Sequence, residues 1–418
     1  MAVVFCQGGS MNRKHCVMSD FLTVKGKDIV RKNKKVRLRG VNLGGWLMME
    51  GYILHSLNRP VCILKNRLKK ALGPRPAREL EAAFHANFIT EDDFRKISGL
   101  GWNCVRVPFH HALIEHEPYR YDAQGVAWLD RVIAWAQQFR LWVILDLHAA
   151  CGSQNHDWHS DSRGKAGLWS QPSCLRRTRA LWAFLADRYR EEPAVAGYDI
   201  LNEAVVADSR RLSGLYRDII REIRQADPRH IIFAEGNSWA TDLSCLDAVD
   251  DAQLVYSVHA YEPLDFTFNF VPCLRYPVKG RTGLFAKASL RRLLSRHRDF
   301  AKSRQRPLFV GEFGVNYRDG LYGEARWLDD ILDIFYEFDF HWTYWTYKAV
   351  KNSAFPDGMF SYYGNPAWVR REGPLLGWDN YVATWPRHRE AMIRSWQTRE
   401  FKPNQKLVAI MKKAVRRS

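Results

Sequence analysis

The chain has 418 residues, of which 46% are hydrophobic and 13% aromatic, and its formal net charge at pH 7 is +18. This composition supports a large buried core, and the absence of Gly/Ser-rich linkers, low-complexity tracts and short repeats favours a single domain. No window approaches the about 18 apolar residues that a membrane span requires, so we expect no integral membrane association. Lys and Arg are spread along the chain without a nucleic-acid-binding motif, so we expect no nucleic acid partner.

Short continuous apolar runs recur along the chain, as is typical of buried parallel strands. We predict eight strands, over residues 36–43, 102–109, 141–148, 197–203, 230–236, 254–261, 307–312 and 340–347. Amphipathic patterns between them predict helices over residues 91–100, 125–139, 175–190, 209–226, 289–304 and 325–338. This alternation predicts an α/β protein built as a single (β/α)8 TIM barrel with long loops at its carboxyl rim. The alternative is an open doubly wound sheet, but the turn Asn42–Trp46 lacks the G-x-G-x-x-G pattern that such a sheet favours.

The two ends of the chain lack the pattern of the middle. We expect residues 1–17 to be a flexible leader or an over-extended start, residues 18–400 to form the barrel domain, and residues 401–418 to be a basic tail. The N-terminal stretch has no apolar run long enough for a signal peptide. None of the eight cysteines forms a C-x-x-C pair, so a reduced setting without a zinc or redox motif fits best. We therefore expect a cytoplasmic monomer, with export by another route or a misassigned start as the alternative.

Two of the predicted strands end in a carboxylate, Glu203 in the fourth and Glu312 in the seventh. An unpaired carboxylate in an apolar setting is costly, so two such strand ends indicate a shared site. The carboxyl ends of barrel strands meet at one rim, where further side chains would join these acids: Asn42, Arg106, His148, Asn202, His259, Tyr261 and Trp345. Cleavage of a glycosidic bond needs two carboxyl groups, one to donate a proton and one to attack or to activate water.

Seven short motifs follow one another along the predicted barrel: Arg39–Trp46, Val105–Pro108, Asp146–His148, Leu201–Glu203, His259–Tyr261, Gly311–Gly314 and Trp345. Together they resemble glycoside hydrolase family 5, the cellulase-type family of retaining β-glycosidases, over about residues 36–348. Two further features, Gly44-Gly45-Trp46 followed by Glu50 and the run Gly152–Asn155, are similar to the exo-β-1,3-glucanase branch. In that branch the acid at the position of Glu50 binds the non-reducing-end glucose.

The resemblance implies a role for each matching residue. Glu203 would be the general acid/base and Glu312 the nucleophile of a double displacement, with Glu203 protonated at rest. Asn202 would bind the sugar 2-hydroxyl, while Arg106 and Tyr261 would hold Glu312 ionised. The same subsite would be lined by Glu50, His148, His259 and Trp345, the last as a stacking platform. The implied substrate is a β-glucan or gluco-oligosaccharide, and no cofactor or metal is implied.

Other features leave the substrate open. Ala204 stands where the family usually has Pro, and the segments Leu57–Ala86 and Lys348–Trp378 are candidates for reshaping the cleft. A β-mannoside or a glycolipid headgroup such as glucosylceramide is the alternative substrate, and a non-catalytic carbohydrate-binding barrel is the alternative class. The run His156–Asp161 contains metal-ligand types, although contact with sugar is the preferred interpretation. The further candidate substrate contacts are His110, Asn155, His156, Asp157 and Trp158.

Overall fold

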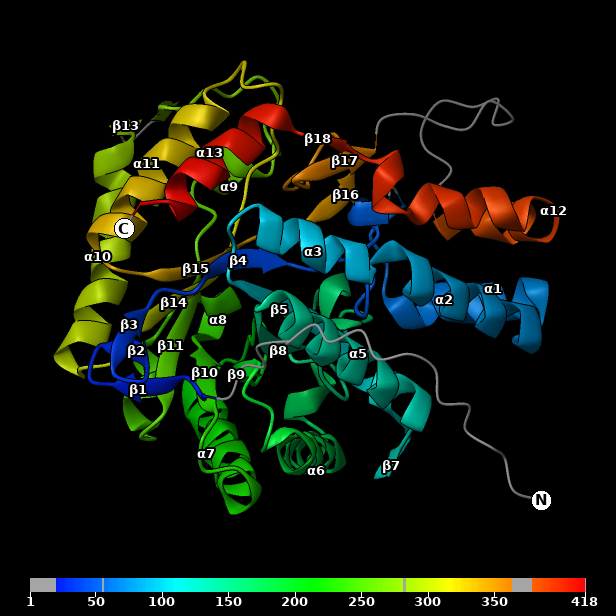
Figure 1. Ribbon diagram of the computed structural model, residues 1–418, viewed down its shortest axis with the longest axis horizontal. Helices are drawn as coiled ribbons and strands as arrows, with labels where there is room; N and C mark the ends of the chain where they lie inside the picture. The colour runs from blue at the N-terminus through cyan, green and yellow to red at the C-terminus, as the bar shows by residue number, and fades with distance from the viewer. Residues whose placement is uncertain (1–19, 55, 281–282, 363–377, 418) are drawn as a thin grey trace, which may run out of the picture.

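The structure, a computed structural model, describes residues 20–54, 56–280, 283–362 and 378–417. The expected leader, residues 1–17, lies outside these ranges. Eight strands join by parallel pairing into a closed barrel, in the order β4, β5, β8, β9, β10, β11, β14 and β15 (Figure 1). Their bounds are Arg39–Asn42, Cys104–His110, Trp142–Ala149, Val195–Asp199, Ile231–Glu235, Leu254–His259, Leu308–Phe313 and His341–Tyr344. The predicted (β/α)8 barrel is confirmed.

The barrel strands are buried along their length, which explains why they read as continuous apolar runs. Every residue of β5 and β8 is buried, because one face of each strand fills the barrel and the other packs against helices. The fourth strand is shorter than predicted, since β9 ends at Asp199 and Glu203 lies in the turn that follows. Glu203 has a φ of 44°, which is a left-handed conformation incompatible with a strand.

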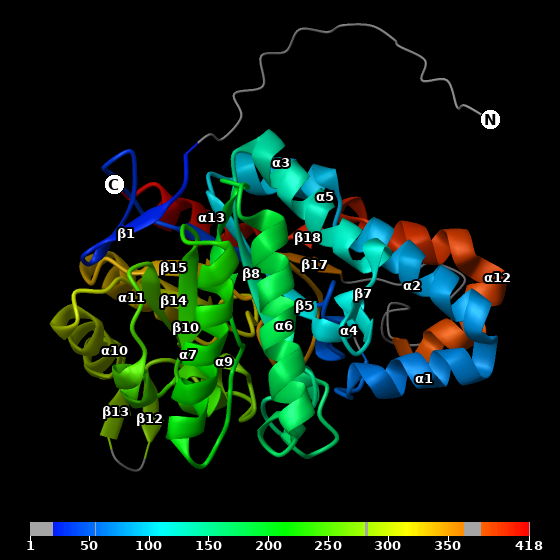
Figure 2. The same ribbon diagram turned by 90° about the horizontal axis from the view of Figure 1, so that it is seen from below.

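Helices cover the outside of the barrel (Figure 2). The six predicted helices are present as α3, α5, α6, α7, α10 and α11, over Glu91–Gly99, Ala123–Phe139, Pro172–Tyr189, Ser209–Ala226, Lys287–Ser303 and Glu324–Glu337. Helix α7 shows the pattern that predicted them, with Leu212 and Ile219 buried and Arg217 exposed. It begins after Asp208, whose side chain accepts a hydrogen bond from the backbone N–H of Arg210 as an N-cap.

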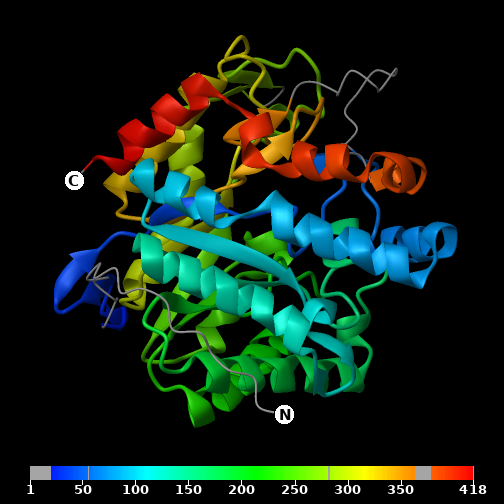
Figure 3. The ribbon, with the colours of Figure 1, turned by 45° about the vertical axis from the view of Figure 1, so that its right-hand side comes forward.

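A layer of three helices lies beside the barrel, formed by α1 (Val61–Leu72), α2 (Pro74–Phe88) and α12 (Trp378–Trp396) (Figures 1 and 3). Helix α1 packs against α2, and α12 contacts both. The segment Leu57–Ala86 therefore builds an added helical layer. Of the loop Lys348–Trp378, residues 348–362 include β16 (Lys348–Val350) and β17 (Phe360–Tyr362), and residues 363–377 lie outside the described ranges.

The basic C-terminal segment, residues 401–418, packs against the barrel where it is described. Strand β18 (Lys402–Pro403) pairs with β17, and helix α13 (Gln405–Val415) packs against α11. Leu407 and Met411, four residues apart on one face of α13, are both buried. The apolar face of this helix thus holds the segment on the barrel despite its positive charge.

Several short strands and helices lie outside the barrel sheet and its covering helices. A three-stranded antiparallel sheet of β1 (Thr23–Lys25), β2 (Asp28–Arg31) and β3 (Lys34–Val36) precedes β4. The remaining strands are β6 (Glu115–Glu117), β7 (Arg120–Tyr121), β12 (Val278–Gly280) and β13 (Gly283–Phe285). The remaining helices are α4 (His111–Ile114), α8 (Asn237–Ala240), α9 (Leu264–Thr267), and the 3-10 turns η1 (Tyr52–Leu54), η2 (Trp158–Ser160), η3 (Gly167–Trp169), η4 (Ser244–Ala248) and η5 (Thr398–Glu400). Among the residues that the structure describes, none of the helices combines the length and apolar character of a bilayer crossing.

Candidate active site

A cleft of about 620 Å³ opens at the carboxyl ends of the barrel strands. It receives side chains from the ends of the strands and from the loops after β4, β8, β9, β10, β11, β14 and β15, so residues distant in sequence share one space. The polar and aromatic residues that line it include Glu50, Tyr52, His148, Asp157, Trp158, His159, Glu203, Trp239, His259, Tyr261, Glu312, Trp345 and Phe355. Both predicted catalytic carboxylates are therefore in the cleft.

Glu203 is held by its backbone as well as by its side chain. Its N–H donates to Glu235 at 2.6 Å, and its carbonyl oxygen accepts a hydrogen bond from Asn155 at 2.9 Å. A left-handed backbone at a residue other than glycine persists only where the surroundings hold it, and these two bonds supply that support. The turn aims the carboxylate of Glu203 into the cleft.

Glu312 lies within β14 and has two hydrogen-bond donors, one for each carboxylate oxygen. Arg106 donates to Oε1 at 2.8 Å, and the hydroxyl of Tyr261 donates to Oε2 at 2.8 Å. Two hydrogen bonds to the two oxygens of one carboxylate fix its orientation. The predicted partners of Glu312 are thus brought to it.

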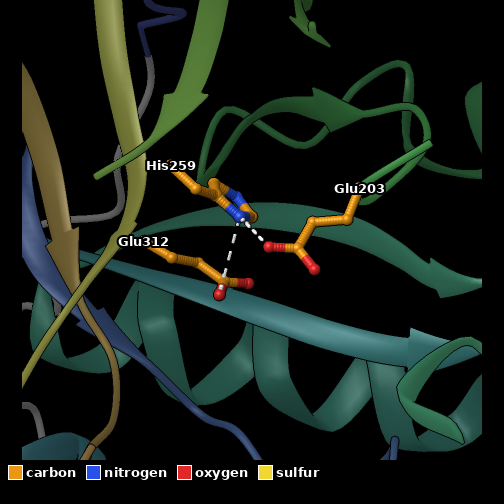
Figure 4. A group of neighbouring side chains, drawn as sticks. All are labelled: Glu203, His259 and Glu312. Carbon is orange, nitrogen blue, oxygen red and sulfur yellow. Dashed lines mark hydrogen bonds and ion pairs between the residues drawn. The ribbon is translucent and has the colours of Figure 1, made fainter. Parts of the chain in front are cut away.

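The imidazole of His259 bridges the two carboxylates (Figure 4). Its Nδ1 lies 2.6 Å from Oε1 of Glu203 and 3.6 Å from Oε2 of Glu312. One carboxylate oxygen of each glutamate and a ring nitrogen of His259 all lie within 4.8 Å of one another. The two carboxylates and the imidazole therefore form one compact group in the cleft.

The pKa values of Glu203 and His259 shift in opposite directions. Burial favours a raised pKa for Glu203, but the hydrogen bond with His259 and the charges of the neighbouring imidazoles lower it to about 2. Burial favours a lowered pKa for His259, but Glu312 and Glu235 together with Glu203 raise it well above the usual value. These two shifts favour the proton on the imidazole rather than on Glu203, in contrast to the expectation that Glu203 itself is protonated at rest.

Arg106 is fully buried and neutralises acids from four strands. Burial opposes its charge, but the surrounding carboxylates raise its pKa well above the usual value. Its guanidinium nitrogens lie 3.1, 2.8, 2.9 and 2.8 Å from the carboxylates of Asp146, Asp199, Glu235 and Glu312. One cation cannot balance four buried anions. Burial therefore raises the pKa of Asp146 to about 7. Burial and the charge of Glu235 raise the pKa of Asp199 well above its usual value.

The far wall of the cleft combines a flat aromatic surface with unpaired polar atoms. The rings of His148 and Trp345 stack at 5.4 Å with an interplanar angle of 11°, and the indole N–H of Trp345 donates to the hydroxyl of Tyr52. Within the described part of the chain, Oε1 of Glu50 and Nδ2 of Asn202 are buried without a hydrogen-bond partner. Glu50 lines the cleft, with Nε2 of His148 at 3.6 Å from this oxygen, whereas Asn202, a predicted substrate contact, is not among the lining residues.

The loop after β8 adds a second imidazole beside Glu203. Nδ1 of His159 lies 3.5 Å from Oε2 of Glu203, and its Nε2 lies 3.7 Å from Asp157. The two oxygens of Glu203 therefore face different imidazoles, His259 on one side and His159 on the other. Asp157 and Trp158, both predicted as substrate contacts, line the cleft with His159.

Three candidate contacts on the same rim have other roles. His110 lies 3.0 Å from Asp161 and accepts a hydrogen bond from the backbone N–H of Ala112, capping α4, so direct substrate contact is corrected for this residue. Asn155 supports the backbone of Glu203 from behind the cleft, and the exposed His156 packs edge-on against Trp239 at 6.0 Å. None of the three is among the lining residues.

Metal-ligand spacing occurs elsewhere than the sequence suggested. Among the described residues, the groups with such spacing are Glu203 with His259 and Glu312, and Asp146 with Asp199 and Glu235. Neither lies in the run His156–Asp161 that raised the possibility. The second group already surrounds the guanidinium of Arg106, which supplies its positive charge.

Several residues of the site were missed from the sequence. Glu235 is the second-last residue of the predicted strand 230–236, so a rule for acids near strand ends, and not only at the last residue, would have found it. His159 was considered only as a metal ligand. Tyr52 comes from a loop, where no strand pattern indicates which side chains reach the rim, and its ring stacks at 4.8 Å on Phe355 of the segment Lys348–Trp378, which was a candidate for reshaping the cleft.

Comparison with known proteins identifies the family of the chain. The family model described as Cellulase (glycosyl hydrolase family 5) matches residues 73–351. A β-xylosidase of Phanerodontia chrysosporium is 32% identical over 79% of this chain and 71% of its own length. Endoglucanase C of Acetivibrio thermocellus is 28% identical over 63% of this chain and 85% of its own. A probable glucan 1,3-β-glucosidase A of Aspergillus fumigatus is 32% identical over 54% of this chain and 56% of its own.

Proposed function

The chain belongs to glycosyl hydrolase family 5, and from that premise we propose that it is a retaining β-glycosidase with Glu203 as general acid/base and Glu312 as nucleophile. The observation that carries this proposal is that one carboxylate oxygen of Glu203 and one of Glu312 lie within 4.8 Å of each other. Retaining enzymes hold the two carboxyl groups about 5–5.5 Å apart, whereas inverting enzymes need about 6.5–9.5 Å to admit a water. The short separation supports attack by Glu312 itself.

In the first step, Glu312 attacks the anomeric carbon and the glycosidic bond breaks. The hydrogen bonds from Arg106 and Tyr261 hold the attacking carboxylate in place, so little reorganisation is needed. Glu203, which is ionised at rest, takes the proton of His259 across the bond of 2.6 Å and passes it to the leaving oxygen, so that Glu203 is ionised again and His259 is neutral. The departing group takes up that proton and leaves as an alcohol.

In the second step, water replaces the departed group and attacks the same carbon. Glu203 takes a proton from this water, and the bond between the sugar and Glu312 breaks. Two displacements at one carbon retain the β configuration. The proton taken by Glu203 returns the pair of Glu203 and His259 to its starting state.

The sugar that is cleaved would bind between Trp345 and the unpaired polar atoms of the far wall. An indole face suits the apolar C–H face of a pyranose, and Asn202 would bond the 2-hydroxyl, where such bonds strengthen in the transition state. Oε1 of Glu50 would accept a hydrogen bond from another hydroxyl of the same sugar. A β-glucan or gluco-oligosaccharide is the substrate that this arrangement supports best.

A second candidate substrate is a β-glycoside with an apolar aglycone, such as a glycolipid. Leu264 and Phe270 line the mouth of the cleft and are 46% and 50% exposed, and Val271 beside them is 45% exposed. A sugar in this position would need hydrogen-bonding groups, which these three side chains do not offer. Exposed apolar side chains grouped at a cleft mouth favour an apolar ligand.

Hydrolysis of a substrate panel tests both proposals. The panel contains laminari-, cello-, gentio- and manno-oligosaccharides, alkyl β-glucosides of increasing chain length and a glucosylceramide, and NMR identifies the anomer released first. We expect the β anomer, absent in Glu203→Gln and Glu312→Gln, and release of the α anomer would contradict a retaining mechanism. If the aglycone is apolar, Phe270→Ala should weaken the preference for long alkyl chains, whereas Tyr119→Ala, an exposed aromatic outside the cleft, should not.

A further inference from the structure

Two buried cysteines face each other beside the cleft. Cys151 follows β8, Cys174 lies in the first turn of α6, and their sulfur atoms are 2.6 Å apart. Carbon atoms, which are smaller than sulfur, settle at about 3.5–4.0 Å when they are not bonded. The separation of the two sulfurs is nearer to the about 2.05 Å of a disulfide bond than to a contact between separate thiols.

The backbone around the pair is shaped for this approach. Gly152 has a φ of 78°, and a Cβ atom at this position would lie 3.0 Å from the sulfur of Cys174 and 2.9 Å from the backbone nitrogen of Leu168. The N–H of Leu168 also donates to the carbonyl of Gly152 at 3.1 Å. A larger residue would push the two cysteines apart, so glycine next to Cys151 is required by the close contact.

A charged side chain near the two cysteines affects the pKa of the Cys151 thiol. Arg177 lies one turn along α6 from Cys174 and pairs with the buried Glu115 at 3.1 Å. Its charge favours the thiolate form of Cys151, but burial and the adjacent Cys174 raise the pKa of that thiol to about 12. Since the thiolate is the reactive form, oxidation would be slow in the folded protein and faster while the chain folds.

We propose that Cys151 and Cys174 form a disulfide bond. With a small disulfide such as oxidised glutathione as the oxidant, one cysteine thiolate attacks a glutathione sulfur and releases one glutathione thiolate. The second cysteine thiolate then attacks the mixed disulfide and releases the other. Two protein thiols lose two protons and two electrons, and the oxidant becomes two glutathione thiols.

The bond would fasten the loop that builds one side of the cleft. The chain between the two cysteines contains Asp157, Trp158 and His159, which line the cleft, and Asn155, which supports Glu203. Closing this loop restricts the unfolded chain and holds those side chains at the rim. A structural disulfide also fits an oxidising compartment better than the reduced cytoplasm expected from cysteine spacing alone.

Refolding with defined redox buffers tests the bond. The full chain is unfolded and reduced, refolded with oxidised and reduced glutathione, blocked with N-ethylmaleimide and digested for mass spectrometry. We expect one peptide pair joined through Cys151 and Cys174, lost on reduction. Alkylation of both cysteines after oxidative refolding, or linkage of either to Cys62, Cys104, Cys245 or Cys273, would overturn the proposal.

Variants separate the bond from the rest of the fold. Cys174→Ser should leave Cys151 open to alkylation and remove the fall in Tm that a reductant causes in the wild-type protein. Cys273→Ser, at an exposed cysteine away from this loop, should keep both the cross-link and that fall in Tm. A reductant that changes the Tm of wild type and Cys174→Ser equally would contradict a role for the bond in stability. The peptide analysis of the wild type decides the bond even if a variant does not fold.

Discussion

The carboxylate of Glu235 accepts a hydrogen bond of 2.6 Å from the backbone N–H of Glu203. The donor belongs to a residue with a φ of 44°, a conformation that costs on the order of 1–3 kcal/mol outside glycine. The other oxygen of Glu235 accepts a bond from Arg106 at 2.9 Å and lies 3.2 Å from His259. One buried acid thus fixes both the proposed acid/base and the imidazole that shares its proton.

Glu235→Gln should impair turnover more than binding. The amide keeps the size of the side chain but removes its charge and one acceptor oxygen, so the turn of Glu203 loses part of its support. Misplacement of a catalytic group by about 1 Å costs about 100-fold, so we expect kcat to fall on that order with a smaller change in KM. Steady-state kinetics measure this, with Glu324→Gln, at a buried glutamate bonded to Arg318 outside the cleft, as the matched control. Equal kcat in both variants would remove the positioning role.

Glu312→Gly should abolish hydrolysis, with a loss on the order of 10⁴-fold or more, because no other group can attack the anomeric carbon. Added azide should enter the vacated space and restore cleavage. The product should be the α-glycosyl azide, because a single displacement inverts the configuration. Mass spectrometry and NMR identify it, and ordinary activity without azide would show that Glu312 is not the nucleophile.

Glu203→Ala should discriminate between leaving groups. A dinitrophenolate needs no proton to depart, so its release in the first step should stay near the wild-type rate. An alkyl or sugar leaving group needs the proton, and its cleavage should slow by about 10²–10⁴-fold. Pre-steady-state release of the two aglycones makes the comparison. The same loss for good and poor leaving groups would count against acid catalysis by this residue.

His159→Gln should shift the basic side of the pH profile upward. Burial opposes the charge of His159, but the Asp157 carboxylate and the charges of Glu203 and Glu312 raise its pKa. A protonated imidazole 3.5 Å from Glu203 lowers the pKa of the acid pair, so its removal should raise that pKa. The profile of kcat/KM against pH reports the change. His156→Gln, in the same loop but outside the cleft, serves as control and should leave the profile unchanged.

The free energy of unfolding should fall as the pH drops below about 6.5. Burial lowers the pKa of both His85 and His341 to about 4, whereas histidines in the unfolded chain titrate near 6.5. Between these values the unfolded chain binds more protons, so stability is complete above pH 6.5 and is lost on the way to pH 4. One pKa unit corresponds to about 1.4 kcal/mol, so each group can contribute on the order of 3 kcal/mol.

Urea unfolding at pH 7 and pH 5 measures this dependence. His341→Gln keeps an acceptor for the backbone N–H of Leu38, which His341 binds at 3.0 Å, and should reduce the loss of stability on acidification. His156→Gln, at an exposed histidine that packs against Trp239, serves as the control. An equal pH dependence in all three proteins would show that His341 does not contribute.

The barrel could be predicted because its strands are buried on both faces and so read as apolar runs. The two carboxylates could be predicted because strand ends meet at one rim. The turn at Glu203 could not, since its left-handed backbone depends on Glu235 and Asn155, which are distant in sequence. The loop residues that line the cleft could not be predicted for a similar reason. Loops carry no periodic pattern, and tertiary contacts determine which of their side chains face the cleft.

The amino-acid composition also did not predict that helix α13 packs against the rest of the protein. Its basic residues led to the prediction of a basic tail, whereas the buried apolar pair Leu407 and Met411 determines how the helix packs. The contact between Cys151 and Cys174 is a further case, because they are 23 positions apart in the sequence and no local motif joins them.

The guanidinium of Arg106 interacts with carboxylates from four barrel strands, and the charges of these five groups form one coupled cluster. Loss of any one acid around it changes how proton and charge are distributed among the others, so paired substitutions there will not have additive effects. Evolution or engineering of this rim must therefore proceed by combined changes. The loop side chains at the mouth, such as Trp158 and Phe270, lie outside that charge cluster. They are the positions where substrate preference can be altered one residue at a time.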